Sequence, residues 1–267
     1  MWAAAPLFLL LLLLLARLRR SGAVPLEPAG RAVLITGCDS GFGHLLALRL
    51  HRLGFTVFAG CLCPGGEGAR RLQREAGAGR LRVLRLDVTR AGDVLAAKEL
   101  VLSHLPERGR IVFMSSIIAY FSLGNGIYSM TKAAIERFCD ALRLEMKKFG
   151  VRVCIIQPGN YARSTKIQPP ISAEEIWNEL SEEEKAVYNK EYVQERANFF
   201  NSILSEGSAN GNEVVDAMVD ALTSPAPKAR YMVAKLKEKA LVFVCALFPT
   251  VVMDYFMSYA LSKVKLA

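Results

Sequence analysis

A short apolar run that ends in a glycine-rich turn and passes directly into a helical pattern constrains the fold most. Residues 32–36 form the apolar run, and a turn at residues 37–43 follows, with glycine at its first, fifth and seventh positions. Residues 44–53 then carry apolar side chains at helical spacing. This order of strand, turn and helix predicts the first unit of a parallel sheet that is covered by helices.

The same alternation continues along the chain. Further β-prone runs occupy residues 56–61, 81–86, 111–115 and 152–157, and helical patterns occupy 69–75, 91–104 and 128–149. The order predicts an α/β fold with a Rossmann-like, doubly wound parallel sheet. With 267 residues, 52% of them hydrophobic, one such domain can bury a large core. We expect this domain at residues 30–267, with a C-terminal lid and an apolar tail within 171–267.

The first 20 residues differ in kind. Residues 2–16 are uncharged and rich in leucine, and Arg17, Arg19 and Arg20 follow them. The run is shorter than the roughly 20 residues that cross a bilayer, and its charge follows it, the reverse of a cleaved signal peptide. We predict a membrane anchor or signal-like segment that leaves the folded part in the cytosol, with a mitochondrial presequence as the alternative.

Charge and cysteine content limit the partners of the chain. The net charge of +9 is dispersed, and no basic run is interleaved with aromatic residues, so we expect no nucleic-acid partner. An anionic membrane or cofactor explains the charge more simply. The six cysteines show no paired CxxC spacing, which favours buried free thiols, and we predict no metal site. Residues 240–253 are uncharged and predict either a membrane-facing surface or a buried C-terminal helix.

Two motifs carry candidate chemistry. The glycines Gly37, Gly41 and Gly43 permit a tight turn and let the backbone approach a pyrophosphate at the start of the next helix. Tyr128 and Lys132 lie four residues apart and therefore on one helix face. For tyrosine to act as a base near neutral pH, its pKa must fall by roughly 3, which is about 4 kcal/mol, and an adjacent ammonium and a positive nicotinamide can supply this. Ser116 can hold a substrate oxygen whose proton passes to Tyr128 while a hydride passes to the nicotinamide.

Together with Pro158-Gly159, these residues resemble the short-chain dehydrogenase/reductase family. The phrases ITGCDSGFG, VFAGCL, YSMTKAAIERFCDALRLEM and VCIIQPGNY are similar to its retinol, hydroxysteroid and 3-hydroxybutyrate dehydrogenase branch, and the resemblance covers nearly the whole chain from Ala32. It implies an oxidoreductase that acts on CH–OH groups, with Ser116, Tyr128 and Lys132 as catalytic residues. The cofactor-binding residues that it implies are Thr36, Gly37, Ser40, Gly41, Phe42, Gly43, Asp87, Val88, Tyr128, Lys132, Pro158 and Gly159.

The end of the second predicted strand bears on the choice of cofactor. In the family an acidic residue there selects NAD and basic residues select NADP, whereas residues 58–61 of this chain are neither. The resemblance thus favours NAD without excluding NADP.

The chain departs from the family after Asp87-Val88. There the family has a helix, a central strand with an Asn-Asn-Ala-Gly motif and two further helices with a catalytic asparagine, before the strand that bears the serine. This chain passes from the helix at 91–104 straight to Arg110-Ile111. The absent block is on the order of 50 residues. We expect the sheet to lack one central strand and its helices, among them a helix that the family uses for pairing into homo-oligomers. A repair is conceivable in which the 111–115 strand moves into the vacant position.

The resemblance leaves substrate and location open. It implies either a lipophilic alcohol of the retinol or hydroxysteroid class, which suits an anchor and aromatic lid residues, or 3-hydroxybutyrate. These substrates belong to retinol, steroid and lipid metabolism. The endoplasmic reticulum membrane is the expected location, with the mitochondrion as the alternative. The other functional hypothesis is a catalytically impaired, splice-type variant that acts as a non-enzymatic, membrane-anchored or partner-binding protein.

Overall fold

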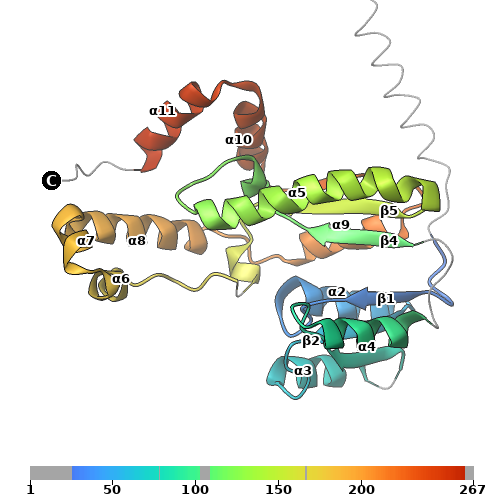
Figure 1. Ribbon diagram of the computed structural model, residues 1–267. Coiled ribbons are helices and arrows are strands. Elements are labelled where there is room, and N and C mark those ends of the chain that lie inside the picture. The colour runs from blue at the N-terminus through green and yellow to red at the C-terminus, as the bar shows by residue number, and fades with distance from the viewer. Residues whose placement is uncertain (1–25, 78, 103–108, 166, 262–267) are drawn as a thin grey trace, which may run out of the picture.

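The computed structural model describes residues 26–77, 79–102, 109–165 and 167–261, and within these ranges the strands form two parallel sheets (Figure 1). The first sheet has the order β1-β2-β3 and the second the order β4-β5-β6. The strands are β1 Ala32–Ile35, β2 Thr56–Cys61, β3 Leu81–Arg85, β4 Arg110–Met114, β5 Arg152–Pro158 and β6 Arg230–Val233. In register, Val57 of β2 lies beside Val33 and Leu81, and Ile155 of β5 lies beside Phe113 and Arg230.

Helices connect and cover the strands. The α-helices are α2 Gly41–Arg52, α3 Glu67–Ala76, α4 Ala91–Leu102, α5 Gly126–Met146, α6 Ala173–Glu179, α7 Glu182–Val187, α8 Lys190–Ser205, α9 Asn212–Thr223, α10 Leu236–Leu247 and α11 Thr250–Leu261. Short 3₁₀ turns are η1 Ile117–Tyr120, η2 Lys147–Phe149 and η3 Ala162–Ser164. The α/β alternation and the parallel pairing confirm the predicted Rossmann-like fold class.

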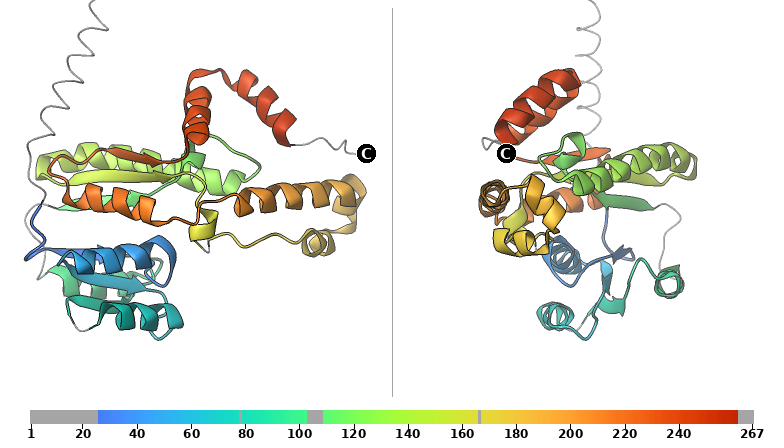
Figure 2. Two further views of the ribbon diagram at one scale, coloured as in Figure 1. Left: turned by 180° about the vertical axis from the view of Figure 1, so that it is seen from behind. Right: turned by 60° about the vertical axis from the view of Figure 1, so that its left-hand side comes forward.

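The two sheets are joined through helices α2 and α9, which pack against each other (Figure 2). One apolar core runs through both halves, with Leu46 of α2, Cys154 of β5 and Met218 of α9 buried in it. At the surface of this contact, Arg49 donates a hydrogen bond of 2.8 Å to Asp216. The helix pair therefore sets how the β1-β2-β3 half lies against the β4-β5-β6 half.

The conceivable repair of the sheet was wrong. The 111–115 strand, now β4, pairs with β5 and not with β1, so β1 and β4 are both edge strands. All five residues of β4 from Arg110 to Met114 lie beside β5, and this pairing uses only one of the two edges of β4. The physical reason for the separation is packing, because α9 contacts β4 and β5 and also packs against α2, and this arrangement holds the free edge of β4 apart from β1.

The C-terminal region differs from the predicted lid. The predicted lid and tail span residues 171–267, but within this range α9 lies in the core, where Val214, Val215 and Ala221 are buried. Its amphipathic pattern fits either place, and β4 and β5 provide the apolar surface that it covers. Strand β6, which the pattern did not predict, extends the second sheet beyond β5.

The structure bears on the two interpretations of residues 240–253, a membrane-facing surface or a buried C-terminal helix. They lie in α10, in α11 and in the link between them, and most of their side chains are exposed, among them Phe243 at 65% and Val251 at 79%, although Val242 is buried. This contradicts a buried C-terminal helix, and contact with a membrane stays a prediction. Of the cysteines, Cys38, Cys61, Cys139 and Cys154 are buried as predicted, whereas Cys63 is exposed, and all six are free thiols. Among the residues that the structure describes, no helix combines the length and apolarity needed to cross a bilayer. The predicted anchor at residues 1–20 lies outside the described residues.

Candidate active site

The glycine turn joins β1 to α2 in the geometry that the sequence predicted. Gly37 and Gly41 have φ angles of +69° and +62°, in the left-handed region that favours glycine. A Cβ on Gly43 would overlap the carbonyl oxygen of Gly37, so the turn also requires glycine at this position. The result is a concave backbone loop at the start of a helix.

The start of α2 is suited to an anion. The N-cap residue Ser40 makes no side-chain capping hydrogen bond, and the first turn of α2 contains no acidic residue. The N–H groups and the positive end of the helix dipole are thus available to a phosphate. The Asp39 carboxylate accepts hydrogen bonds from the N–H groups of Leu62 (2.8 Å) and Cys63 (3.1 Å), which fastens the turn to the end of β2. Sequence reasoning missed this role of Asp39, whose position inside the glycine motif was the available signal.

The second group of candidate residues lies at the end of β4 and on α5. Ser116, which is buried, donates a hydrogen bond of 3.2 Å from its Oγ to the Pro158 carbonyl oxygen. Lys132 Nζ lies 5.5 Å from the ring centre of Tyr128 and donates a hydrogen bond of 3.3 Å to the Met114 carbonyl. Asn125 caps α5 by accepting a hydrogen bond of 3.2 Å from the Tyr128 N–H. The structure therefore assembles Ser116, Tyr128 and Lys132 beside Pro158.

Burial governs the ionisation of this group. Burial raises the pKa of the Tyr128 phenol, and its hydrogen bond with Ser116 opposes that change. Burial also lowers the pKa of the Lys132 ammonium. Both changes favour the neutral form, so in the free protein Tyr128 is held protonated.

A buried polar network continues along the inner face of α5. Glu136 is 6% exposed and follows Lys132 by four residues. Its Oε1 accepts a hydrogen bond of 3.0 Å from Gln157 of β5, and its Oε2 accepts one of 3.2 Å from Arg230 of β6. Arg230 also donates to Asp140, one helical turn further, at 2.7 Å. The network ties α5 to both strands. Sequence reasoning missed it, although acidic residues four apart on a buried helix face are its signature.

Two candidate residues have other partners. The Asp87 carboxylate accepts hydrogen bonds from the N–H (3.0 Å) and hydroxyl (2.7 Å) of Thr89, and the hydrogen bonds with Thr89 lower the pKa of Asp87. Val88 is exposed. Gly159 donates its N–H to the Val233 carbonyl at 2.8 Å, and a Cβ there would overlap the Glu238 carboxylate, so Pro158-Gly159 at the end of β5 is fixed between β6 and α10.

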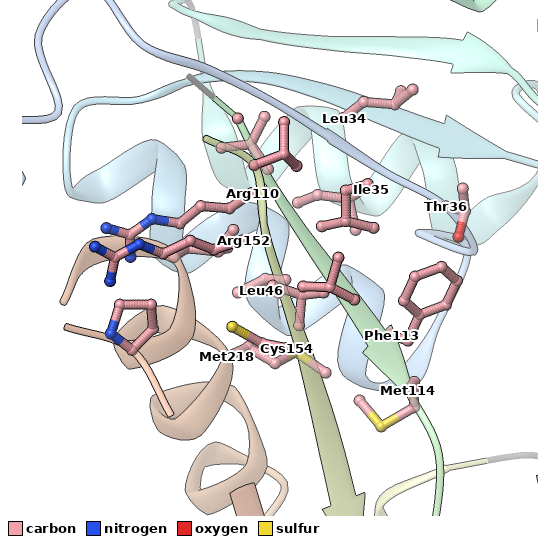
Figure 3. A pocket seen from close by; sticks show the side chains of 18 of the residues that line it. Leu34, Ile35, Thr36, Leu46, Arg110, Phe113, Met114, Arg152, Cys154 and Met218 are labelled. Carbon is pink, nitrogen blue, oxygen red and sulfur yellow. The ribbon is translucent and has the colours of Figure 1, made fainter. Parts of the chain in front are cut away.

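A cavity of about 2630 Å³ is bounded by β1 and the glycine turn on one side and by β4 on the other (Figure 3). Its wall includes several of the predicted cofactor residues: Thr36, Gly37, Ser40, Gly41, Phe42, Gly43 and Val88. Ser116, Tyr128, Lys132, Asp87 and Pro158-Gly159 lie outside the described wall. The loop after β5 connects the two groups, because Phe42 packs edge-on against Tyr161 with ring centres 6.2 Å apart and a Cβ on Gly41 would lie 3.9 Å from Thr165.

Comparison with known proteins gives consistent matches. The family described as short chain dehydrogenase matches residues 94–176. Mitochondrial D-beta-hydroxybutyrate dehydrogenase of Bos taurus is 31% identical over 275 residues, covering 80% of each chain. Retinol dehydrogenase 7 of Mus musculus and 17-beta-hydroxysteroid dehydrogenase type 6 of Rattus norvegicus are each 32% identical, covering 74% of this chain and 79% of theirs.

Solved structures share the fold at lower identity. A short-chain dehydrogenase from Streptomyces avermitilis has a TM-score of 0.62 at 18% identity, covering 87% of this chain and 98% of that one. A short chain dehydrogenase/reductase from Burkholderia phymatum, crystallised with NAD, has a TM-score of 0.60 at 16% identity, covering 90% of this chain and 99% of its own.

Proposed function

We propose, from the premise that this chain belongs to the short-chain dehydrogenase/reductase family, that it is an NAD-dependent oxidoreductase that interconverts a lipophilic alcohol and its carbonyl compound. The observation that carries the proposal is the joint position of Ser116, Tyr128 and Lys132 beside Pro158. The open helix start at the glycine turn supplies a separate site for a pyrophosphate.

The chemistry follows from the positions of these side chains. The first-turn N–H groups of α2 would bind the pyrophosphate, and Ser116 Oγ would hold the substrate oxygen. Tyr128 would take the proton of the alcohol, and the Lys132 ammonium beside its ring would stabilise the resulting phenolate. When bound, NAD supplies the acceptor for the hydride. Because burial raises the pKa of Tyr128, deprotonation depends on Lys132 and on the positive cofactor.

NAD is preferred to NADP on the basis of the end of β2. The strand ends at Cys61, and the chain contains no charged side chain between there and Glu67. A 2′-phosphate would therefore find no basic partner in this stretch. Solved relatives bind either cofactor, since one crystallised with NAD and another, from Burkholderia cenocepacia, with NADP.

The substrate class is proposed from the names of the relatives and from an aromatic cluster on α8. The relatives are named for hydroxybutyrate, retinol and 17-beta-hydroxysteroid. Arg196 lies over the rings of Phe199 (5.4 Å) and Phe200 (5.5 Å). A Cβ on Gly124, four residues before Tyr128, would meet Phe200 at 3.6 Å. The Arg196 guanidinium lies closer still to this position, and the aromatic rings beside the loop that precedes Tyr128 support retinol or a hydroxysteroid over hydroxybutyrate.

The first test of the proposal is thermal unfolding of the full chain in mild detergent, with and without NADH. NADH at about 100 times its dissociation constant should stabilise the fold by about 2.7 kcal/mol. Gly43→Ala should lose this stabilisation, because its Cβ overlaps the Gly37 carbonyl. Gly65→Ala is the matched control, since no atom lies within 4 Å of its Cβ. If NADH does not raise the unfolding temperature of the wild type, or raises that of Gly43→Ala equally, the cofactor site is refuted. The wild-type protein should also oxidise retinol or a hydroxysteroid.

We further propose that the chain lacks the internal block described above. The alignment with the bovine relative runs over 275 positions, but it includes only 80% of the 267 residues of this chain, or about 214 residues. About 60 positions of the alignment therefore contain no residue of this chain. The two edge strands β1 and β4 agree with this proposal. If NADH stabilises the protein but none of the three substrates is turned over, the catalytically impaired variant becomes the better hypothesis.

A membrane location is also proposed, on the cytosolic face of the endoplasmic reticulum with the mitochondrion as the alternative. Helices α10 and α11 stand away from the two sheets (Figure 2), and they carry exposed apolar side chains. These are Leu236, Phe243, Leu247, Phe248, Val251 and Tyr255, and Lys235, Lys237 and Lys239 flank them. Apolar side chains with lysines beside them are suited to an anionic bilayer surface. The homo-oligomer that the resemblance implies stays a prediction, which light scattering can test.

We expect vesicles of phosphatidylcholine and phosphatidylserine to slow hydrogen exchange in α10 and α11 of the full chain by at least about tenfold, and to leave α6 and α7 unchanged. Phe243→Ser with Val251→Ser should remove this protection, whereas Val187→Ser, an exposed apolar site on α7, should not. Equal protection in the double variant would contradict the proposed surface.

A further inference from the structure

The cavity between the two halves lies at the edges of strands. Its wall includes every residue of β1 from Ala32 to Ile35 and every residue of β4 from Arg110 to Met114. Successive side chains of a strand point to opposite faces of a sheet. A cavity that meets consecutive residues of both strands therefore lies in the plane of the sheets, between the two edges.

The hydrogen bonds between β1 and β2, and those between β4 and β5, show which peptide groups point into this cavity. Thr56 of β2 donates its N–H to the Arg31 carbonyl, and Arg152 of β5 donates its N–H to the Gly109 carbonyl. In a parallel strand the peptide groups of alternate residues point to opposite sides. The peptide groups that point toward the cavity are therefore those of Ala32 and Leu34 in β1 and those of Arg110 and Val112 in β4. The cavity therefore offers backbone hydrogen-bond donors and acceptors to both edges of a further strand.

Apolar side chains make up much of the rest of the wall, as they do around a buried strand, although lysines and Arg143 also contribute to it. Leu46 of α2 and Met218 of α9 contribute to it, as do Val94 and Ala97 of α4 and Ile135 of α5 (Figure 3 labels the first two). Strands buried on both faces are apolar throughout. The volume of about 2630 Å³ exceeds the roughly 300–1000 Å³ of ordinary small-molecule sites. The size and the lining are those of a site for polypeptide.

The charge of the cavity indicates the direction and the flanking sequence of an occupant. Arg31, Arg110 and Arg152 lie where β1, β4 and β5 begin, and Arg110 and Arg152 extend side by side in Figure 3. The pKa of Arg110 is lowered by burial and by the neighbouring Arg152. Among the described residues of the wall there is no Asp or Glu. A strand parallel to β1 and β4 would begin at this basic end, so acidic residues before it would be attracted there.

We propose that the cavity binds an extended apolar segment of a separate polypeptide, inserted as a strand parallel to β1 and β4 and preceded by acidic residues. Its backbone would hydrogen-bond with both edges, as in other cases of recognition by strand addition. Insertion would join the two sheets into one. The site does not depend on the proposed oxidoreductase activity.

The experiment uses the full chain and the fluorescent probe peptide Asp-Glu-Glu-Val-Ile-Val-Leu-Val-Asn. We expect the peptide to bind and to slow hydrogen exchange at residues 32–35 and 110–114 by at least tenfold. A peptide with lysines in place of its three acidic residues should bind about tenfold more weakly. Absence of binding at millimolar peptide, equal binding of both peptides, or protection confined to α10 and α11 would overturn the proposal.

Two proline variants locate the binding to the strand edges. Leu34→Pro and Val112→Pro each remove an N–H that points into the cavity and leave the existing ladders intact, a position where an edge strand tolerates proline. Each should weaken binding of the first peptide about tenfold, whereas Leu34→Ala, which keeps the N–H, should bind nearly as wild type. Unchanged binding in both proline variants would overturn the proposal. So would protection of both edges that rises with protein concentration without peptide, because a second copy would then be the occupant.

Discussion

Replacing Tyr128 with phenylalanine is expected to reduce alcohol oxidation by about 10²- to 10⁴-fold, the usual contribution of a general base. The change removes the hydroxyl that would take the substrate proton and keeps the ring beside Lys132. Stabilisation by NADH should persist, because the glycine turn is untouched. The measurement is kcat/KM with the best of the three alcohols. Met130→Leu, on the exposed side of the same helix, is the control and should be nearly as active as the wild type.

The pH dependence provides a second readout of the same residue. Burial raises the pKa of Tyr128, so at pH values below that pKa the phenol is mostly protonated and oxidation should accelerate as pH rises. Lys132→Met removes the cation that stabilises the phenolate, which should move the rising limb to higher pH. A rate that falls with increasing pH, or an identical profile in Lys132→Met, would contradict the assignment of Tyr128 as the base.

The parts of this site that the sequence predicted are those that depend on short-range spacing. Gly37, Gly41 and Gly43 act within one turn, where the left-handed φ angles and the overlap at Gly43 are local properties. Tyr128 and Lys132 meet because they lie one helical turn apart. Such relations do not depend on the remainder of the chain, which is why the sequence alone predicts both motifs.

The parts that escaped prediction depend on contacts between distant residues. Arg230 reaches Glu136 across 94 positions of the chain, and nothing in the local sequence of either residue records the other. The apolar face of α9 suits a lid as well as a core, and only the position of β4 and β5 decides between them. The division into two sheets also depends on contacts between distant residues, because it results from the pairing of β4 with β5 and not with β1.

The largest effect on stability is expected from Arg230→Met, which would leave the buried Glu136 carboxylate without its cation. Breaking one side of a buried ion pair costs about 3–5 kcal/mol, and the lower end applies because the Arg230 side chain is 34% exposed. The free energy of unfolding in urea should therefore fall by about 3 kcal/mol. Arg137→Met is the matched control, since its side chain is 87% exposed and its contact with Asp140 lies at the surface, where a pair contributes about 0–1 kcal/mol.

A double variant separates loss of the pair from loss of packing. Glu136→Gln together with Arg230→Met removes the stranded carboxylate and keeps an amide that can still accept the hydrogen bond from Gln157. If the uncompensated charge causes the destabilisation, the double variant should be more stable than Arg230→Met alone. If the two are equally unstable, the guanidinium acts through packing against β5 and α5 instead. Tyr128 and Lys132 share their helix with Glu136, so in the second case activity should fall together with stability in both variants.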